Sequence, residues 1–165
     1  MAPWWPHRSP TWNPTNLFVG AVRLECKKTK RSIDLGCGGF LRLRRKVAEL
    51  CGEEMLTYYQ LMLDSLYRQF NSPDEKEKFW ENYDEAVGRL VTRKRMSTKV
   101  VNFLYDSDSE GRATYGTCKI LLKIIGDYDD NILDGYAART DCARFRDFKA
   151  ILEDCVRTKS TIVWY

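Results

Sequence analysis

The sequence predicts an all-α fold, a single bundle of about five to seven helices around one central apolar helix. Three observations support this prediction. Apolar residues recur at spacings of three and four over long stretches, the segment from 112 to 125 is very apolar, and no alternating apolar–polar run is longer than a few residues. With 165 residues, 44% of them apolar, the chain is long enough to bury one core.

The chain is expected to begin with an irregular arm. Residues 1–16 hold four of the five prolines and three of the five tryptophans, and proline removes backbone donors and blocks helix formation. We therefore divide the chain into an arm, residues 1–16, and a single helical domain, residues 17–165. At the start of the domain, residues 17–24 could form a short helix or strand, and residues 27–31 form a charged loop.

A long helix is predicted from about residue 40 to residue 70. The glycines at 36, 38 and 39 interrupt the chain before it, and Asn71-Ser72-Pro73 stops it. Its apolar residues fall on one helical face because they are three or four positions apart. They are Leu43, Val47, Leu50, Cys51, Met55, Tyr58, Met62, Leu66 and Phe70.

A second helix is predicted to begin at the same stop signal. Ser72 is a suitable N-cap, Pro73 fits the first helical position, and two acids follow at the positive helix end. The apolar face continues to Val91 and could extend past Arg93-Lys94-Arg95 to Val100, Val101 and Leu104.

Two more helices are expected in the last third of the chain. The acidic loop 106–110 precedes the most apolar helix, residues 112–125, which we assign to the centre of the bundle. Gly126 and an Asp-rich stretch end this helix. A final helix is predicted over residues 131–157, with Phe145, Phe148, Ile151, Leu152, Cys155 and Val156 facing inward.

The composition favours neither metal nor cofactor binding. None of the six cysteines forms a CxxC pair, and His7 is the single histidine, so we predict no metal site, no cofactor and free thiols in a reducing compartment. The acidic loop 106–110 lacks the ligand spacing of a calcium-binding EF-hand. No apolar run approaches the ~18 residues of a membrane span, so we expect an intracellular, cytoplasmic protein without a transmembrane anchor.

One enzyme alternative remains open. The segment Ile33-Asp34-Leu35-Gly36-Cys37-Gly38-Gly39 resembles the DLGCGxG motif of S-adenosylmethionine-dependent methyltransferases. Its last two glycines are adjacent, and a long helix follows where alternating strands and helices are needed. Because acid–base catalysis also lacks a histidine in the folded part, we expect no enzyme.

A basic helical nucleic-acid-binding protein is the other alternative. Short basic runs occur at residues 27–31, 42–46 and 93–95. Acids in neighbouring turns offset them, and the net charge is only +4, so a solvated surface explains them and no nucleic-acid partner is expected.

Two segments resemble the Bcl-2 family of apoptosis regulators. Val47-Ala48-Glu49-Leu50-Cys51-Gly52-Glu53-Glu54-Met55 is similar to a BH3 segment, in which apolar residues precede a small residue, a glycine and an acid. Phe103-Leu104-Tyr105-Asp106, followed by Gly111-Arg112 and an apolar helix, resembles the BH1 region. The Asn-Trp that precedes Gly-Arg in BH1 is replaced by Ser109-Glu110, and no BH2 signature is present; Trp164 alone could stand near its start.

The resemblance implies a surface groove that binds BH3 helices. In that groove Arg112 would pair with the aspartate of the incoming helix, and Gly111 would keep the groove floor low. The apolar wall is assigned to Tyr58, Met62, Leu66, Tyr83, Val101 and Leu104. A rival pair, Gly88-Arg89, matches the same pattern. Arg112 is preferred because three cations follow Arg89 and would be costly to bury in a central helix.

By the same resemblance, the chain looks like a compact viral, pro-survival member that inhibits apoptosis. Its partners would be pro-apoptotic BH3-containing proteins of the Bim-like and Bak/Bax-like kinds, which could bring it to mitochondria. A homodimer is an alternative to the monomer.

Overall fold

The computed structural model describes residues 22–35, 38–107, 109–128 and 145–165. Helices hold most of these residues, as the sequence predicts, but four short strands form a sheet that the predicted all-α fold lacks. The strands have three to five residues each, too few for an alternating pattern to emerge. The helical part of the prediction is confirmed, and the sheet is a correction to it.

The sheet joins segments from both ends of the described chain. Strands β1 (Val22–Cys26) and β2 (Ser32–Leu35) form a hairpin, and β3 (Gly111–Ala113) and β4 (Ile162–Trp164) complete the sheet in the order β2-β1-β4-β3. All neighbouring strands are antiparallel. One face is buried, and it carries Leu24, Cys26, Ile33, Leu35, Ala113, Ile162 and Trp164.

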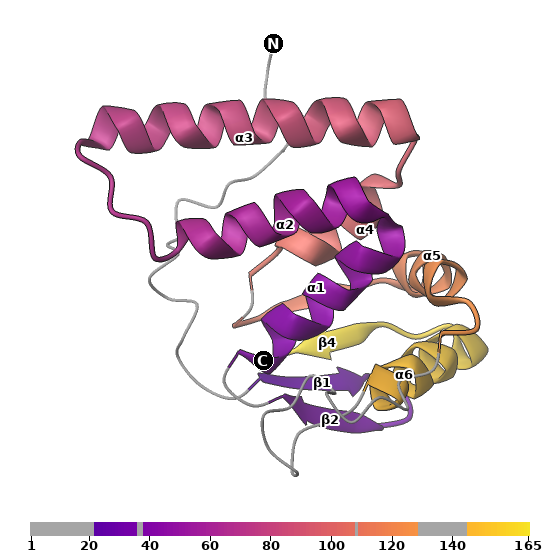
Figure 1. Cartoon of the computed structure of the whole chain (residues 1–165). Coiled ribbons are helices and arrows are strands. Elements are labelled where there is room, and N and C mark those ends of the chain that lie inside the picture. Colours follow the sequence, from indigo (N-terminus) through magenta and orange to yellow (C-terminus); the bar gives the residue numbers. More distant parts are fainter. Residues whose placement is uncertain (1–21, 36–37, 108, 129–144) are drawn as a thin grey trace.

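The predicted long helix is two helices, α1 (Gly39–Cys51) and α2 (Glu53–Ser65), which meet at Gly52. Gly52 has φ 127° and ψ 159°, a conformation that is essentially restricted to glycine. The break falls inside the segment that resembles BH3, so this segment is not one continuous helix. In Figure 1, α1 runs from the sheet to this corner and α2 turns away from it.

The next predicted helix is also divided, into α3 (Pro73–Lys94) and α4 (Thr98–Tyr105). The predicted start is confirmed, because the Ser72 side chain accepts a hydrogen bond from the Glu75 amide and Pro73 occupies the first turn. Arg95 ends α3 in the left-handed conformation, and Ser97 caps α4.

The apolar helix α5 (Tyr115–Ile125) begins later than predicted because residues 111–113 form β3. Helix α6 (Phe145–Thr158) covers the described part of the predicted final helix, and residues 131–144 lie outside the described residues, as does the predicted arm, residues 1–16. Helix α6 packs against β1, β2 and β4, while α5 packs against α6, α1 and α4. No helix in the described ranges is long and apolar enough to cross a membrane.

The molecule is layered in Figure 1, with the sheet at one end and α3 at the other. Helix α2 lies next to α3, α4 lies behind α2 in this view, and α1 runs from α2 to the sheet. A single core cluster runs through these layers and includes residues of every helix and strand.

Candidate helix-binding site

The apolar side chains assigned to the groove wall come together, mostly as buried residues. Met62 of α2, Tyr83 of α3 and the α4 residues Val101 and Leu104 are at most 6% exposed and belong to the core cluster. Tyr58 of α2 is half-buried against the same cluster. Leu66, at the end of α2, is half-buried outside it. These residues therefore mark a seam where α2, α3 and α4 meet, and α3 already fills it.

Tyr83 is the polar centre of the seam. Its hydroxyl donates a hydrogen bond to the Tyr58 carbonyl at 2.8 Å and lies 2.8 Å from the Tyr105 hydroxyl of α4. Burial raises the pKa of Tyr83 far above its ordinary value, and neighbouring Tyr105 raises it further. Tyr83 is therefore a neutral donor that joins α3 to α2 and α4.

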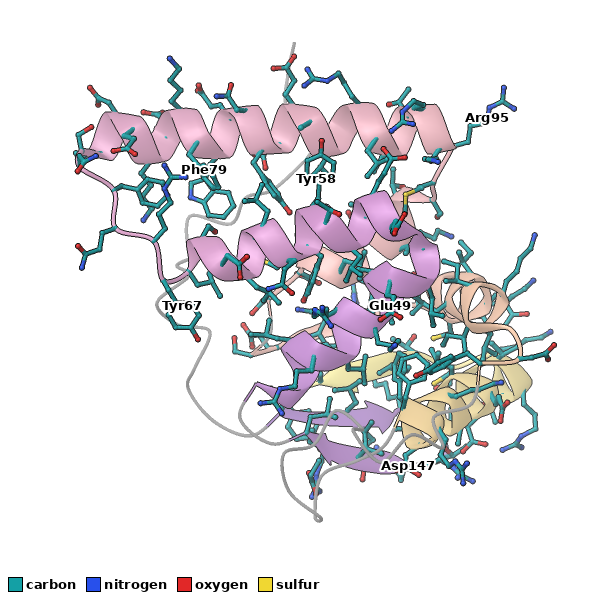
Figure 2. All side chains as sticks on the ribbon, in the orientation of Figure 1. Glu49, Tyr58, Tyr67, Phe79, Arg95 and Asp147 are labelled. Atoms are coloured by element: carbon teal, nitrogen blue, oxygen red, sulfur yellow. The ribbon has the colours of Figure 1, made fainter. Side chains whose placement is uncertain are left out.

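Aromatic rings extend the seam toward the start of α3. The Phe79 ring lies 5.5 Å from Phe70 and 5.1 Å from Trp80, and the Arg68 guanidinium lies 5.1 Å from the rings of both phenylalanines. Figure 2 shows Tyr58 and Phe79 in the space between α2 and α3. Contacts between large aromatic rings add to the packing of α3 against the end of α2 and the turn after it.

Helix α3 is amphipathic and forms the outermost layer. Its buried residues are Trp80, Tyr83, Val87, Gly88, Leu90 and Val91, whereas its other face is charged. The surface that α2 and α4 present is thus one that accepts an amphipathic helix. Two of the three exposed large apolar residues in the described ranges, Leu61 and Tyr67, also belong to α2 and the turn after it.

Arg112 and Gly111 lie elsewhere, in the sheet. Arg112 is exposed on β3 opposite Val163, two residues before the N-cap of α5. Gly111 packs against the Trp164 indole. Because the sheet and α3 are at opposite ends of Figure 1, the structure does not bring this pair together with Tyr83.

The rival pair, Gly88-Arg89, is on α3 itself. Gly88 is buried, whereas Arg89 is exposed and its guanidinium donates to the Glu85 carboxylate one turn earlier, at 2.6 Å. Since residues 87, 88, 90 and 91 face inward, Arg89 points away from α2. Neither candidate arginine lines the seam in this conformation.

One buried arginine was not predicted from the sequence. Arg44 is 1% exposed; its guanidinium stacks 3.9 Å from the Phe40 ring and donates to the Asp106 and Ser107 carbonyls at 2.8 and 3.2 Å. The Trp164 Nε1 donates to the same Ser107 carbonyl at 2.9 Å. Arg44 is four residues after Phe40 and three before Val47, so it falls on the same buried face of the helix. This spacing could have identified it as a buried residue.

The described residues of the glycine-rich segment lie at the end of the hairpin and before α1. Asp34 pairs with Arg23 across the hairpin at 2.7 Å, and Gly38 precedes α1 with φ 77°; Gly36 and Cys37 lie outside the described residues. The described sheet is antiparallel, whereas a Rossmann-like methyltransferase requires parallel strands. Within the described ranges, no group of three or more His, Cys, Asp or Glu side chains is arranged to hold a metal ion.

Comparisons of the chain with protein-family models, with curated proteins and with solved structures found no match.

Proposed function

We propose that this protein is a non-enzymatic binding protein that takes an amphipathic helix of another protein against α2 and α4. The observation that supports the proposal is the seam itself. Helix α3 lies there as an outer layer, held through aromatic side chains. A partner helix with apolar residues at the same three- and four-residue spacings meets the same chemical surface.

The resemblance to the Bcl-2 family supplies the class of partner. BH3 helices of pro-apoptotic proteins are amphipathic and carry one aspartate, so we propose that binding them inhibits apoptosis. Tyr58, Met62, Val101 and Leu104 would contact the apolar face of such a helix, and Leu66 would lie at its end. Neither Arg112 on β3 nor Arg89 on the outer face of α3 lines the seam, so charge-reversal variants decide which arginine meets the aspartate.

Helix α3 must move away from α2 and α4 for this binding to occur. The partner competes with Trp80 and Tyr83 for the same surface, so the measured affinity is reduced by the fraction of molecules in which α3 has moved. A change that loosens α3 without altering α2 should therefore tighten binding. Binding at a site elsewhere on the surface would not depend on the position of α3, so this dependence distinguishes the seam from other sites.

Calorimetric titration with a panel of BH3 peptides tests the proposal. We expect submicromolar binding to at least one peptide, lost when its aspartate is replaced. Tyr83→Phe, which removes the hydroxyl bond to Tyr58, should tighten binding by up to about tenfold. Tyr115→Phe, on α5, is the matched control and should change nothing.

Two outcomes would count against the proposal. Folded, helical protein that binds no peptide of the panel removes the BH3 partner class, and unchanged affinity in Tyr83→Phe removes the competition with α3. The arginine assignment is tested separately by charge reversal. Weakening by Arg112→Glu supports Arg112, whereas weakening by Arg89→Glu alone transfers the role to Arg89.

A further inference from the structure

Two turns that are far apart in the sequence lie side by side at one corner of the sheet. The β1–β2 turn holds residues 27–31, and the end of α6 with the turn that follows it holds residues 157–161. The Lys28 amide donates to the Ser160 hydroxyl at 3.2 Å, and the Lys28 ammonium donates to the Thr158 carbonyl at 2.8 Å. Backbone and side-chain bonds thus hold the two turns as one surface.

This surface, which we name the basic corner, carries six exposed cations. They are Lys27, Lys28, Lys30, Arg31, Arg157 and Lys159. In the sequence the run 27–31 stands alone, and the acids next to it explain it as an ordinary solvated loop. In the fold, Arg157 and Lys159 join this run, which the sequence alone does not indicate.

Asp154 of α6 bonds to both segments of the corner. It is buried, and its carboxylate accepts hydrogen bonds from Arg31 Nε at 2.7 Å, Arg157 Nη2 at 2.8 Å and Thr29 Oγ1 at 3.1 Å. The other acid in contact is Glu25, which pairs with Lys30 at 3.1 Å and has 17% of its side chain exposed. The two bonded acids are less exposed than the cations, so positive charge predominates on the surface of the corner.

The corner has a local excess of positive charge. The corner contains six of the 27 Lys and Arg residues and, with Asp154 and Glu25, two of the 23 Asp and Glu residues. A local excess of this kind attracts polyanions.

Two of the six cations occupy strained backbone positions. Lys30 has φ 62° and Lys159 has φ 51°, in the left-handed region that glycine or asparagine adopts at lower cost. A lysine at the tip of each of the two neighbouring turns places an exposed charge where backbone preference alone favours a smaller residue.

We propose that the basic corner binds nucleic acid through its phosphate backbone. This surface goes beyond the helix-binding seam and is independent of it. Phosphates fit six exposed cations on a polar surface that needs no apolar contact. An anionic membrane is disfavoured because no exposed large apolar residue in the described ranges belongs to either turn to enter the lipid.

The test is fluorescence anisotropy of the full chain with short, labelled single-stranded RNA and duplex DNA over a series of salt concentrations. Up to six phosphate contacts give a slope of log K against log salt of up to about −5 for duplex DNA and about −4 for a single strand. Vesicles of phosphatidylcholine and phosphatidylserine form a second arm. Lys27→Glu/Lys159→Glu should weaken nucleic-acid binding at least tenfold at low salt and reduce the size of the slope by about 1.5.

Lys76→Glu/Lys78→Glu is the matched control, since it makes the same change in net charge at exposed positions of α3. It should leave both affinity and slope nearly unchanged. Equal weakening in the two double variants would reduce the effect to overall charge and overturn the corner as a site. Absence of nucleic-acid binding at low salt would overturn the proposal, and binding to the vesicles alone would assign the corner to lipid headgroups.

Discussion

Gly111 lies against the face of the Trp164 indole, at a distance that leaves no room for a side chain. A Cβ at residue 111 would come within 2.8 Å of three indole atoms. Trp164 is fixed in turn, because its ring lies 5.4 Å from Phe40 and 6.0 Å from Phe103. The glycine that the family resemblance places on a groove floor has a packing role in this sheet.

Gly111→Ala should therefore lower the free energy of unfolding by about 1–3 kcal/mol, since a well-packed core absorbs an added methyl group poorly. Chemical denaturation followed by tryptophan fluorescence measures it. Gly116→Ala is the matched control: its Cβ would approach the flexible end of Lys99, and alanine favours a helix. The control should be neutral or stabilising, and equal destabilisation of both variants would contradict the packing role.

Arg44→Met should destabilise the protein by about 2–4 kcal/mol. It removes charge-assisted hydrogen bonds to the Asp106 and Ser107 carbonyls and the stacking on Phe40. The neighbouring Arg45 is exposed and bonds to Gln60, so Arg45→Met should change stability by less than about 0.5 kcal/mol. Thermal unfolding of the two variants measures the difference. Unchanged stability of the Arg44→Met variant would show that this buried cation does not stabilise the fold.

Gly52→Ala should cost about 1–3 kcal/mol although open space surrounds the position. The cost comes from the backbone, because Gly52 has φ 127° and ψ 159°. Glu53→Ala, one residue later, loses only a favourable charge at the start of α2 and should cost about 0.5 kcal/mol. If Gly52→Ala is instead stabilising and adds helical circular dichroism, α1 and α2 form one continuous helix.

Asp154→Asn should destabilise the protein at neutral pH, by about 1–3 kcal/mol, and the difference should vanish in acid. Hydrogen bonds from Arg157, then Arg31 and Thr29, lower the pKa of this carboxyl below its ordinary 3.8 despite burial. A group with a depressed folded-state pKa stabilises the fold above its unfolded pKa, and this stability is lost as the pH falls through the folded value. Unfolding curves for both proteins from pH 7 down to about pH 1 test this; a difference that does not shrink as the pH falls below 3.8 would contradict it.

The helical elements were predictable because their signals are local. Ser72 and Pro73 mark the start of α3 within the sequence itself, and the apolar spacing of α1, α2 and α6 follows from their own residues. The two helix breaks were missed for a related reason. The apolar face continues on both sides of Gly52, so the spacing gives no sign of a break. Arg95 adopts a left-handed conformation that is not typical of arginine, so the residue type does not indicate a helix end.

The sheet and the basic corner depend on contacts between distant segments. Leu24 pairs with Trp164, and Arg31 with Asp154, across more than a hundred residues, and no single stretch of sequence contains either relationship. The candidate site also depends on contacts between distant segments. Met62, Tyr83 and Leu104, which the family resemblance assigns to a groove wall, belong to one core cluster, but the sequence does not tell whether a helix of this chain already covers them.

The place of β4 in the sheet has a consequence for the order in which the fold is made. The strand lies between β1 and β3, so it supplies the only described backbone link between the hairpin and residues 111–113. During synthesis, α1 to α5 can form from local contacts, whereas the sheet must wait until residues 162–164 have left the ribosome. Until then the edges of β1 and β3 that pair with β4 remain open to other strands.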